Sequence, residues 1–326
     1  MRRFDLAAAG SFLEGARLAA QPGTMLKAGG VDLIDLLKEH LAEPGHVVSI
    51  RKVAGAAEVR EDGDAIVIGA CATLATVARH EGLLARAHAI AEAAGEAASP
   101  QIRNQATAAG NLLQRPRCWY FRKEEIVCRK KGGPECLALD GENRYHAIFG
   151  NRVCAIVHPS NLAPALMLFD ARLRTVAPDG KRRELALADL FLTPEKDVSR
   201  EHALATGEVI ESIVVPPRDG GAQSAFVEMR EKQAFDWPLV AAAVRLATDG
   251  RVVTDARIVL GAVAPVPLRR EAAEKALVGK ALTEESARDA AKAAFADATP
   301  LSQNAYKIAA GTTILARAIL AAGGQR

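Results

Sequence analysis

The sequence contains few aromatic residues, little net charge and no long hydrophobic run. Phe, Trp and Tyr make up 4% of its 326 residues, and the formal net charge is only +3. The basic run Arg129-Lys130-Lys131 has no stripe of basic and aromatic residues around it, so we expect no nucleic-acid binding. Apolar stretches are broken by charges, Gly or Pro well short of about 18 residues, so we also expect no membrane insertion. The N-terminus lacks an apolar core followed by a cleavage site, which predicts no signal peptide.

Cysteine is nearly absent outside one segment. Four of the five cysteines, Cys118, Cys128, Cys136 and Cys154, fall within 37 residues, and Cys71 stands apart among small residues typical of packing. In a chain without a secretion signal, clustered thiols bind metal more often than they form disulfides. Their spacing lacks the CxxC pairs of a zinc ribbon and the tight spacing of ferredoxins. Four thiolates are nonetheless the number that a cubane iron–sulfur cluster requires, with a zinc site or free cysteines as the alternatives.

The sequence also lacks the three-glycine dinucleotide fingerprint and the phosphate loop that ends in Gly-Lys-Ser/Thr. It has instead two other loops suited to phosphate. Lys27-Ala28-Gly29-Gly30-Val31-Asp32-Leu33 places a glycine pair just before a predicted helix, where backbone N–H groups can approach a phosphate. Thr107-Ala108-Ala109-Gly110-Asn111 has side chains small enough to expose its amides. Each loop taken alone could be a plain turn or a tight connection between elements.

Periodicity along the chain predicts helices and strands in both halves. In the first half we expect helices at 31–42, 73–80, 83–98 and 161–170, and strands at 46–50, 65–69, 172–176 and 209–215. In the second half we expect strands at 239–247 and 252–263, and helices at 268–277, 283–296 and 302–322. Residues 115–155 show little periodicity, and a loop of this length in a compact domain needs a reason such as a metal cluster. A domain boundary is expected near residue 218, at the linker that follows Pro216-Pro217.

The two loops belong to an ordered series of motifs along the chain. The later motifs are Ile68-Gly69-Ala70-Cys71-Ala72-Thr73, Ser160-Asn161-Leu162-Ala163-Pro164, Gly207-Glu208-Val209-Ile210-Glu211-Ser212-Ile213, Arg230-Glu231-Lys232-Gln233-Ala234-Phe235-Asp236 and Tyr306-Lys307. The series resembles the FAD-binding medium subunits of the xanthine dehydrogenase, aldehyde oxidoreductase and carbon monoxide dehydrogenase group. The resemblance covers essentially the whole chain, and the ordered series is far more specific than any single motif.

The resemblance implies which residues hold FAD. The two loops would bind its pyrophosphate, and the segment around Ile210 would border the flavin ring. The implied FAD-binding residues are Lys27, Ala28, Gly29, Gly30, Val31, Asp32, Leu33, Thr107, Ala108, Gly110, Asn111, Leu113, Ser160, Asn161, Leu162, Ile210 and Lys232. The sequence departs from the family pattern at three places. Asn161 stands where Asp is common, and Glu228 stands where Lys is often found near the flavin. Ala108-Ala109-Gly110 replaces a more glycine-rich version of the second loop.

The cysteine segment narrows the resemblance. Residues 111–122, from Asn111 through Cys118 to Arg122, resemble a subgroup of these subunits that carries an extra [4Fe–4S] cluster and includes bacterial periplasmic aldehyde oxidoreductases. The resemblance implies that Cys118, Cys128, Cys136 and Cys154 are the cluster ligands.

The implied fold is α+β. Residues 1–217 would form a two-lobed FAD-binding domain with the cysteine-rich insertion at 115–155, and residues 218–326 a small sheet covered by helices. The implied function is electron transfer in a complex with a large molybdenum-cofactor subunit and a small [2Fe–2S] subunit. That complex would oxidise an aldehyde or N-heterocycle, and the FAD would pass electrons to an external acceptor.

Because the cofactors carry the redox chemistry, no side chain of this chain need be an acid–base catalyst. The location would be cytoplasmic, or periplasmic if a partner carries an export signal. Two alternatives are a non-redox structural or assembly subunit with a zinc site, and a self-sufficient flavin oxidase. The oxidase would need substrate-site residues of its own, and the sequence shows no such constellation.

Overall fold

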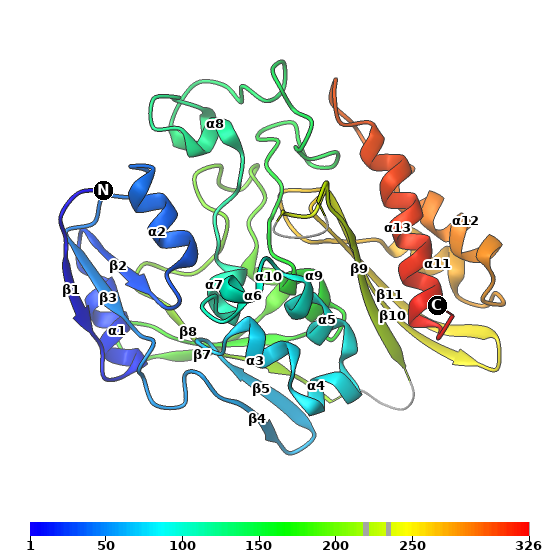
Figure 1. Ribbon diagram of the computed structural model, residues 1–326, viewed down its shortest axis with the longest axis horizontal. Coiled ribbons are helices and arrows are strands. Elements are labelled where there is room, and N and C mark those ends of the chain that lie inside the picture. Colours follow the sequence, from blue (N-terminus) through cyan, green and yellow to red (C-terminus); the bar gives the residue numbers. More distant parts are fainter. Residues whose placement is uncertain (218–221, 233–235, 326) are drawn as a thin grey trace.

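The N-terminal lobe is a small parallel sheet flanked by two helices. The computed structural model describes residues 1–217, 222–232 and 236–325 (Figure 1). The elements of this lobe are β1 (Asp5–Ala8), α1 (Phe12–Ala19), β2 (Thr24–Lys27), α2 (Val31–Lys38) and β3 (His46–Ser49). Its strands pair in the order β1–β3–β2. Helix α2 begins directly after Gly30, whose positive φ of 81° suits a residue without a Cβ, and buries Leu33, Leu36 and Leu37 on its inner face.

The second lobe is a five-stranded antiparallel sheet covered by short helices. The strands lie in the order β4–β5–β8–β6–β7, so the chain returns to this sheet after a long excursion between β5 and β6. The strands are β4 (Val59–Asp62), β5 (Ala65–Gly69), β6 (Arg172–Val176), β7 (Arg182–Ala186) and β8 (Val209–Val215). The helices are α3 (Leu74–Ala78), α4 (Glu81–Arg86), α5 (His88–Glu96), α6 (Pro100–Arg103), α7 (Ala108–Leu112), α9 (Leu162–Met167) and α10 (Leu187–Leu190).

The C-terminal region is a four-stranded antiparallel sheet with three helices on one face (Figure 1). Its elements are β9 (Gln223–Met229), β10 (Val240–Asp249), β11 (Val252–Gly261), β12 (Leu268–Arg269), α11 (Glu271–Leu277), α12 (Glu284–Ala294) and α13 (Tyr306–Ala322). Helix α12 buries Ala287, Ala290, Ala291 and Ala294 at helical spacing, so alanine forms most of the packed face of that helix. On the other face of the sheet, Phe226, Ala241 and Val259 join the buried core of the second lobe.

The cysteine-rich segment, residues 115–155, lies at the top of Figure 1 between the N-terminal lobe and the C-terminal region. It contains only one short helix, α8 (Trp119–Arg122), and one 3-10 turn, η1 (Arg129–Lys131), within a segment that is described throughout. This confirms the predicted lack of regular structure. None of the described helices is both long and apolar enough to cross a membrane.

The α+β fold class is confirmed, and so are the bounds predicted for β5, β6 and β8. Several helix predictions were wrong in extent or type. The helix predicted at 83–98 is broken at Ala87, whose extended φ of −147° separates α4 from α5. Residues 108–112, predicted as a loop, form the short helix α7, and residues 268–269 form a strand instead of the start of a helix. The domain boundary predicted near residue 218 falls at 218–221, outside the described residues, and stays a prediction.

Candidate cofactor sites

The two predicted phosphate loops meet at one large cavity. The cavity has a volume of about 740 Å³, which is in the range of small-molecule and cofactor sites. The chain just before the second loop touches the first loop, because the Gln105 side-chain amide donates to the Gly29 carbonyl at 2.8 Å. A Cβ on Gly29 would lie 2.2 Å from the Gln105 carbonyl oxygen. Glycine at position 29 is therefore required by the close approach of the two loops.

The second loop is held in place by side chains behind it. Thr107 caps α7, and its hydroxyl accepts a hydrogen bond from the Gly110 amide at 3.3 Å. The Asn111 side-chain oxygen accepts from the Ser160 hydroxyl at 2.6 Å and from the Leu162 amide at 3.3 Å. The segment that starts α9 thus fixes the orientation of Asn111, which lines the cavity.

Most of the predicted FAD-binding residues line this cavity. They are Lys27, Ala28, Gly29, Gly30, Val31, Asp32, Leu33, Thr107, Gly110, Asn111, Leu113, Asn161 and Ile210. Four predicted residues are absent from the lining, namely Ala108, Ser160, Leu162 and Lys232. Ala108 and Leu162 are fully buried in the core, Ser160 lies behind Asn111, and Lys232 is exposed to solvent. For these four residues the structure does not support a direct contact with a ligand in the cavity.

Two of the departures from the family pattern, Asn161 and Glu228, are bonded to each other. The Asn161 side-chain amide donates to the Glu228 carboxylate at 2.6 Å, and Arg230 forms an ion pair with the same carboxylate. The Glu228 side chain is only 5% exposed. An amide at position 161 is therefore compatible with a buried carboxylate at 228, whereas an ionised Asp there would repel it.

Several lining residues were not predicted. They include Ala97, Ala98, Ser99, Gln101, Ile102, Arg115, Arg117, His202, Glu208, Asp236 and Trp237. Burial lowers the pKa of His202, so its imidazole is neutral near pH 7. Trp237 comes from the C-terminal region, and the only sequence signal for it was its place directly after the Arg230–Asp236 motif.

The four clustered cysteines line a second, small cavity together with His146. The His146 Nε2 atom lies 3.2 Å from the Cys118 sulfur, and the Cys136 and Cys154 thiols are hydrogen-bonded to each other. That pairing lowers the pKa of Cys136 to about 6 and raises the pKa of Cys154. Burial raises the pKa of Cys118 to about 11.

Cys71 lies apart, buried in the core of the N-terminal lobe. Within the described residues, no group of three or more His, Cys, Asp or Glu side chains has the arrangement needed to hold a single metal ion.

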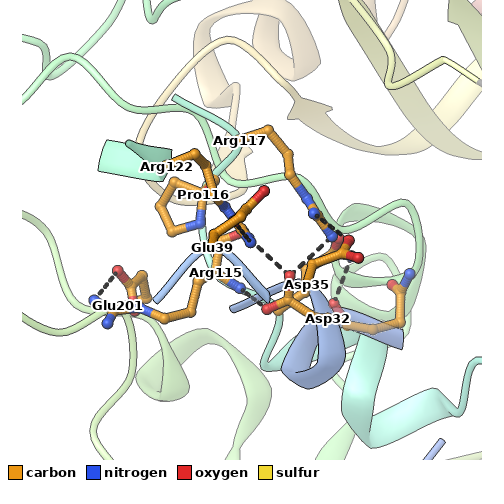
Figure 2. Close-up of polar contacts among 10 residues, drawn as sticks. Asp32, Asp35, Glu39, Arg115, Pro116, Arg117, Arg122 and Glu201 are labelled. Carbon is orange, nitrogen blue, oxygen red and sulfur yellow. Dashed lines mark hydrogen bonds and ion pairs between the residues drawn. The ribbon is translucent and has the colours of Figure 1, made fainter. Parts of the chain in front are cut away.

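Charged side chains join the cysteine segment to the N-terminal lobe (Figure 2). The carboxylate of Asp32, two residues after Gly30, accepts from Arg122 at 2.7 Å, from Arg117 at 2.9 Å and from the Arg115 backbone amide at 2.9 Å. Asp32 was predicted to bind FAD and lines the cavity, and its carboxylate also binds the segment that leads to Cys118.

A second set of buried charges joins the cysteine segment to the chain before β8. The Glu201 carboxylate pairs with Arg115 at 3.0 Å and with Lys130 at 2.7 Å, and the Lys130 side chain is 1% exposed. Burial alone would raise the pKa of Glu201, but the two cations beside it bring the pKa below its ordinary value.

The end of the segment is fastened to the C-terminal region. The buried Asn304 side chain donates to the backbone carbonyls of His146 and Ala147, each at 3.2 Å. Lys307, fully buried, donates to the carbonyls of Tyr145 and Ala262 at 3.0 Å. The cysteine segment therefore has polar contacts with all three parts of the fold.

Comparison with known proteins gives two matching families that together span most of the chain. Residues 2–218 match the FAD binding domain in molybdopterin dehydrogenase, and residues 224–322 match the CO dehydrogenase flavoprotein C-terminal domain.

Individual relatives agree with these families. The chain is 35% identical to the aldehyde oxidoreductase FAD-binding subunit PaoB of Escherichia coli K12, over 95% of both chains. It is 30% identical to the carbon monoxide dehydrogenase medium chain of Hydrogenophaga pseudoflava, over 98% of this chain and 97% of that one. A chain from a solved structure of carbon monoxide dehydrogenase from Hydrogenophaga pseudoflava superposes with a TM-score of 0.77 at 28% identity, covering 99% of this chain and 98% of that one. The chain belongs to the FAD-binding flavoprotein subunits of the molybdenum-containing dehydrogenases, and the large cavity is suited to its FAD.

Proposed function

We propose that this chain transfers electrons through FAD within a complex that oxidises an aldehyde or an N-heterocycle. Its partners would be a large subunit that holds the molybdenum cofactor and a small subunit that holds [2Fe–2S] clusters. The names of the relatives support this proposal, because PaoB is the FAD-binding subunit of an aldehyde oxidoreductase. The complex would act in the cytoplasm, or in the periplasm if a partner carries an export signal.

FAD fits the large cavity by the chemistry of its lining. The loops at Gly29–Gly30 and Gly110–Asn111 carry small or no side chains, so their backbone amides can approach a pyrophosphate. Asn161 and Ile210 line the same cavity. When bound, FAD would accept electrons from the partner's clusters and yield them to an external acceptor. This chain's own residues would bind and orient the cofactor.

We also propose that the four cysteines hold a [4Fe–4S] cluster. The observation that carries this proposal is their convergence on one cavity from four positions in a segment with almost no regular structure. The four thiolates of a cubane cluster bind four different iron atoms, so they stand further apart than the ligands of one ion. Metal binding would also supply ordering free energy that such a loop lacks in its own packing.

A zinc site is the competing assignment for these cysteines. Zinc needs four ligands around a single ion, and the described residues show no such arrangement. Metal analysis of the purified complex separates the two assignments. The hydrogen bond with Cys154, and to a smaller extent Arg129, lower the pKa of Cys136, and this favours the thiolate that an iron ligand must be.

The test is metal, sulfide and flavin analysis of the complex purified through a tag on this chain. We expect molybdenum, FAD, the two partner subunits, and more iron and labile sulfide than the [2Fe–2S] clusters account for. Cys118→Ala, Cys128→Ala, Cys136→Ala and Cys154→Ala should each remove most of that excess, because an incomplete cage exposes the cluster to solvent.

Cys71→Ala is the matched control and should leave iron unchanged, because its thiol is buried elsewhere. Normal iron in two or more of the four variants would refute the cluster. Zinc in place of iron would show that the four cysteines form a zinc site. A colourless chain that purifies without partners would contradict the electron-transfer function itself.

A further inference from the structure

His146 lies beside one of the four clustered cysteines. Its Nε2 atom is 3.2 Å from the Cys118 sulfur, and both side chains line the cysteine cavity. His146 is only 3% exposed, so this contact is largely shielded from water. None of the motifs that carry the family resemblance includes it. The imidazole ring is therefore part of the wall around the proposed cluster.

The ring is held in place by an aromatic neighbour and by its own backbone. The Trp119 ring meets it edge-on, with 5.0 Å between the ring centroids and 78° between the planes. The His146 amide donates to the Asn143 carbonyl at 3.0 Å, and its carbonyl accepts from the Asn304 side chain at 3.2 Å. Asn304 lies just before α13, so the C-terminal region helps to set the position of the ring.

The chemistry of an iron ligand decides which ring nitrogen carries a proton. A cysteine binds iron as a thiolate, which has no proton and can only accept a hydrogen bond. A bare Nε2 atom at 3.2 Å from the Cys118 thiolate would bring two lone pairs together. An Nε2–H group at the same place makes a charge-assisted hydrogen bond instead.

The other ring nitrogen agrees with this assignment. Nδ1 of His146 is buried and makes no hydrogen bond with the described residues. A proton there would be a buried N–H without an acceptor, which is costly. We therefore assign the proton to Nε2, which faces the sulfur.

We infer that His146 acts on the proposed cluster through Cys118, by donating its Nε2–H to that sulfur and so raising the reduction potential of the cluster. A hydrogen bond to a cluster sulfur favours the reduced state, because that state carries one more negative charge. The inference rests on the proposed [4Fe–4S] cluster and uses no feature of the FAD site.

Three variants separate the hydrogen bond from packing. His146→Phe keeps a flat ring against Trp119 and removes the donor. His146→Gln keeps an N–H group within reach of the Cys118 sulfur. Tyr120→Phe is the matched control, because Tyr120 lines the same cavity but its hydroxyl accepts from the Glu142 amide at 2.8 Å.

The experiment is a redox titration of the full purified complex followed by EPR, after iron, labile sulfide and flavin have been measured. The signal of this cluster is the one that Cys118→Ala removes. We expect His146→Phe to lower the midpoint potential of the cluster, by at least about a fivefold change in its reduction equilibrium, or roughly 40 mV for one electron. His146→Gln should recover part of that shift, and Tyr120→Phe should change the equilibrium less than about twofold.

Three results would overturn the role of His146. They are normal iron with an unchanged potential in His146→Phe, an equal shift in Tyr120→Phe, and an equal shift in His146→Gln. The first would show that the contact does not affect the cluster. The other two would show that packing, and not the donated hydrogen bond, sets the potential.

A second measurement uses the wild-type complex, so it does not depend on the folding of a variant. Pulsed EPR of the reduced cluster, in protein grown with nitrogen-15-labelled histidine, detects histidine nitrogens close to the iron. We expect a weak coupling, because a hydrogen bond keeps Nε2 outside the iron coordination. The absence of any histidine coupling would contradict the hydrogen bond, and a strong coupling would show that His146 is an iron ligand instead.

Failure of the cluster and failure of this inference give different results. A wild-type complex with no iron beyond its [2Fe–2S] clusters would refute the cluster, and the inference with it. Excess iron together with any of the contradictory results would overturn the role of His146 alone and leave the cluster in place.

Discussion

The FAD cavity and the cysteine cavity lie side by side but are built in different ways. Backbone, small residues and the ends of helices form much of the FAD cavity, as at Gly29 and Thr107. The cysteine cavity lies in a segment with little secondary structure, and long charged side chains such as Arg122 and Lys130 fasten that segment to its neighbours. The first site should therefore be sensitive to added bulk, and the second to lost charge.

This difference explains how the two sites can be coupled. Asp32 lies in the first turn of the helix that follows the Gly29–Gly30 loop, and its carboxylate binds Arg117 and Arg122 of the cysteine segment. A change that loosens the segment should reach the FAD loop through this one carboxylate. These ion pairs join the two sites, which are therefore not independent units.

The largest effect is expected from breaking the buried charges of the cysteine segment. Glu201→Gln leaves Lys130, with a side chain that is 1% exposed, without its carboxylate partner. Loss of one partner from a buried ion pair typically costs about 3–5 kcal/mol. We expect a lower free energy of unfolding in urea and faster proteolysis within 115–155.

The exposed Glu271 provides the matched control for this prediction. Its pairs with Arg269 and Lys275 are 3.8 and 3.9 Å long, and its side chain is 61% exposed. Glu271→Gln should leave stability nearly unchanged, because exposed pairs contribute little. Equal effects of the two substitutions would show that the Glu201 network does not hold the segment.

Added bulk in the FAD cavity should have the next largest effect. Gly29→Ala places a methyl group against the Gln105 carbonyl and wedges the two loops apart. Overpacking of this kind costs about 1–3 kcal/mol, or roughly five- to 150-fold in FAD affinity. Flavin content per chain should fall while iron stays bound.

Gly45→Ala is the control for bulk, because nothing lies within 4 Å of a Cβ at that exposed position. It should retain full flavin content. If Gly29→Ala binds FAD as tightly as Gly45→Ala does, the two loops are not fixed against each other as the structure indicates.

The smallest effect is expected from pH at Glu208, which also lines the FAD cavity. Burial would raise the pKa of this carboxyl, but hydrogen bonds from Arg183, Thr175 and the Ala205 amide lower it to about 2. In the unfolded chain its pKa is near 4.5. The stabilisation is therefore fully present above about pH 4.5 and is lost as the pH falls toward 2.

The difference in urea midpoint between the wild type and Glu208→Gln measures this contribution to stability. The wild type should be the more stable protein at pH 6, and the difference should shrink steadily between pH 4.5 and pH 3. A difference that is the same at both pH values would mean that ionisation of Glu208 is not the source of the stabilisation.

Local patterns were sufficient to predict much of the fold. The buried strand β5 (Ala65–Gly69) and strand β8 (Val209–Val215) were predicted to the residue, because apolar runs bounded by turn signals leave little choice. The strand β1 (Asp5–Ala8) was missed, because all four of its residues are exposed and carry no alternation. The break at Ala87 was missed as well, because an alanine-rich run gives no local signal for its non-helical backbone.

The sequence by itself determined the two loops with their small residues and the four cysteines in one segment. Small residues in a loop and cysteines clustered in one segment can be recognised without a structure, because their chemistry depends on residue type. Only the tertiary structure decided that Asn161 pairs with Glu228 and that Arg117 stacks on Trp237 at the cavity. These contacts join residues 67 and 120 positions apart, and no local pattern encodes which distant side chains the packed sheets bring together.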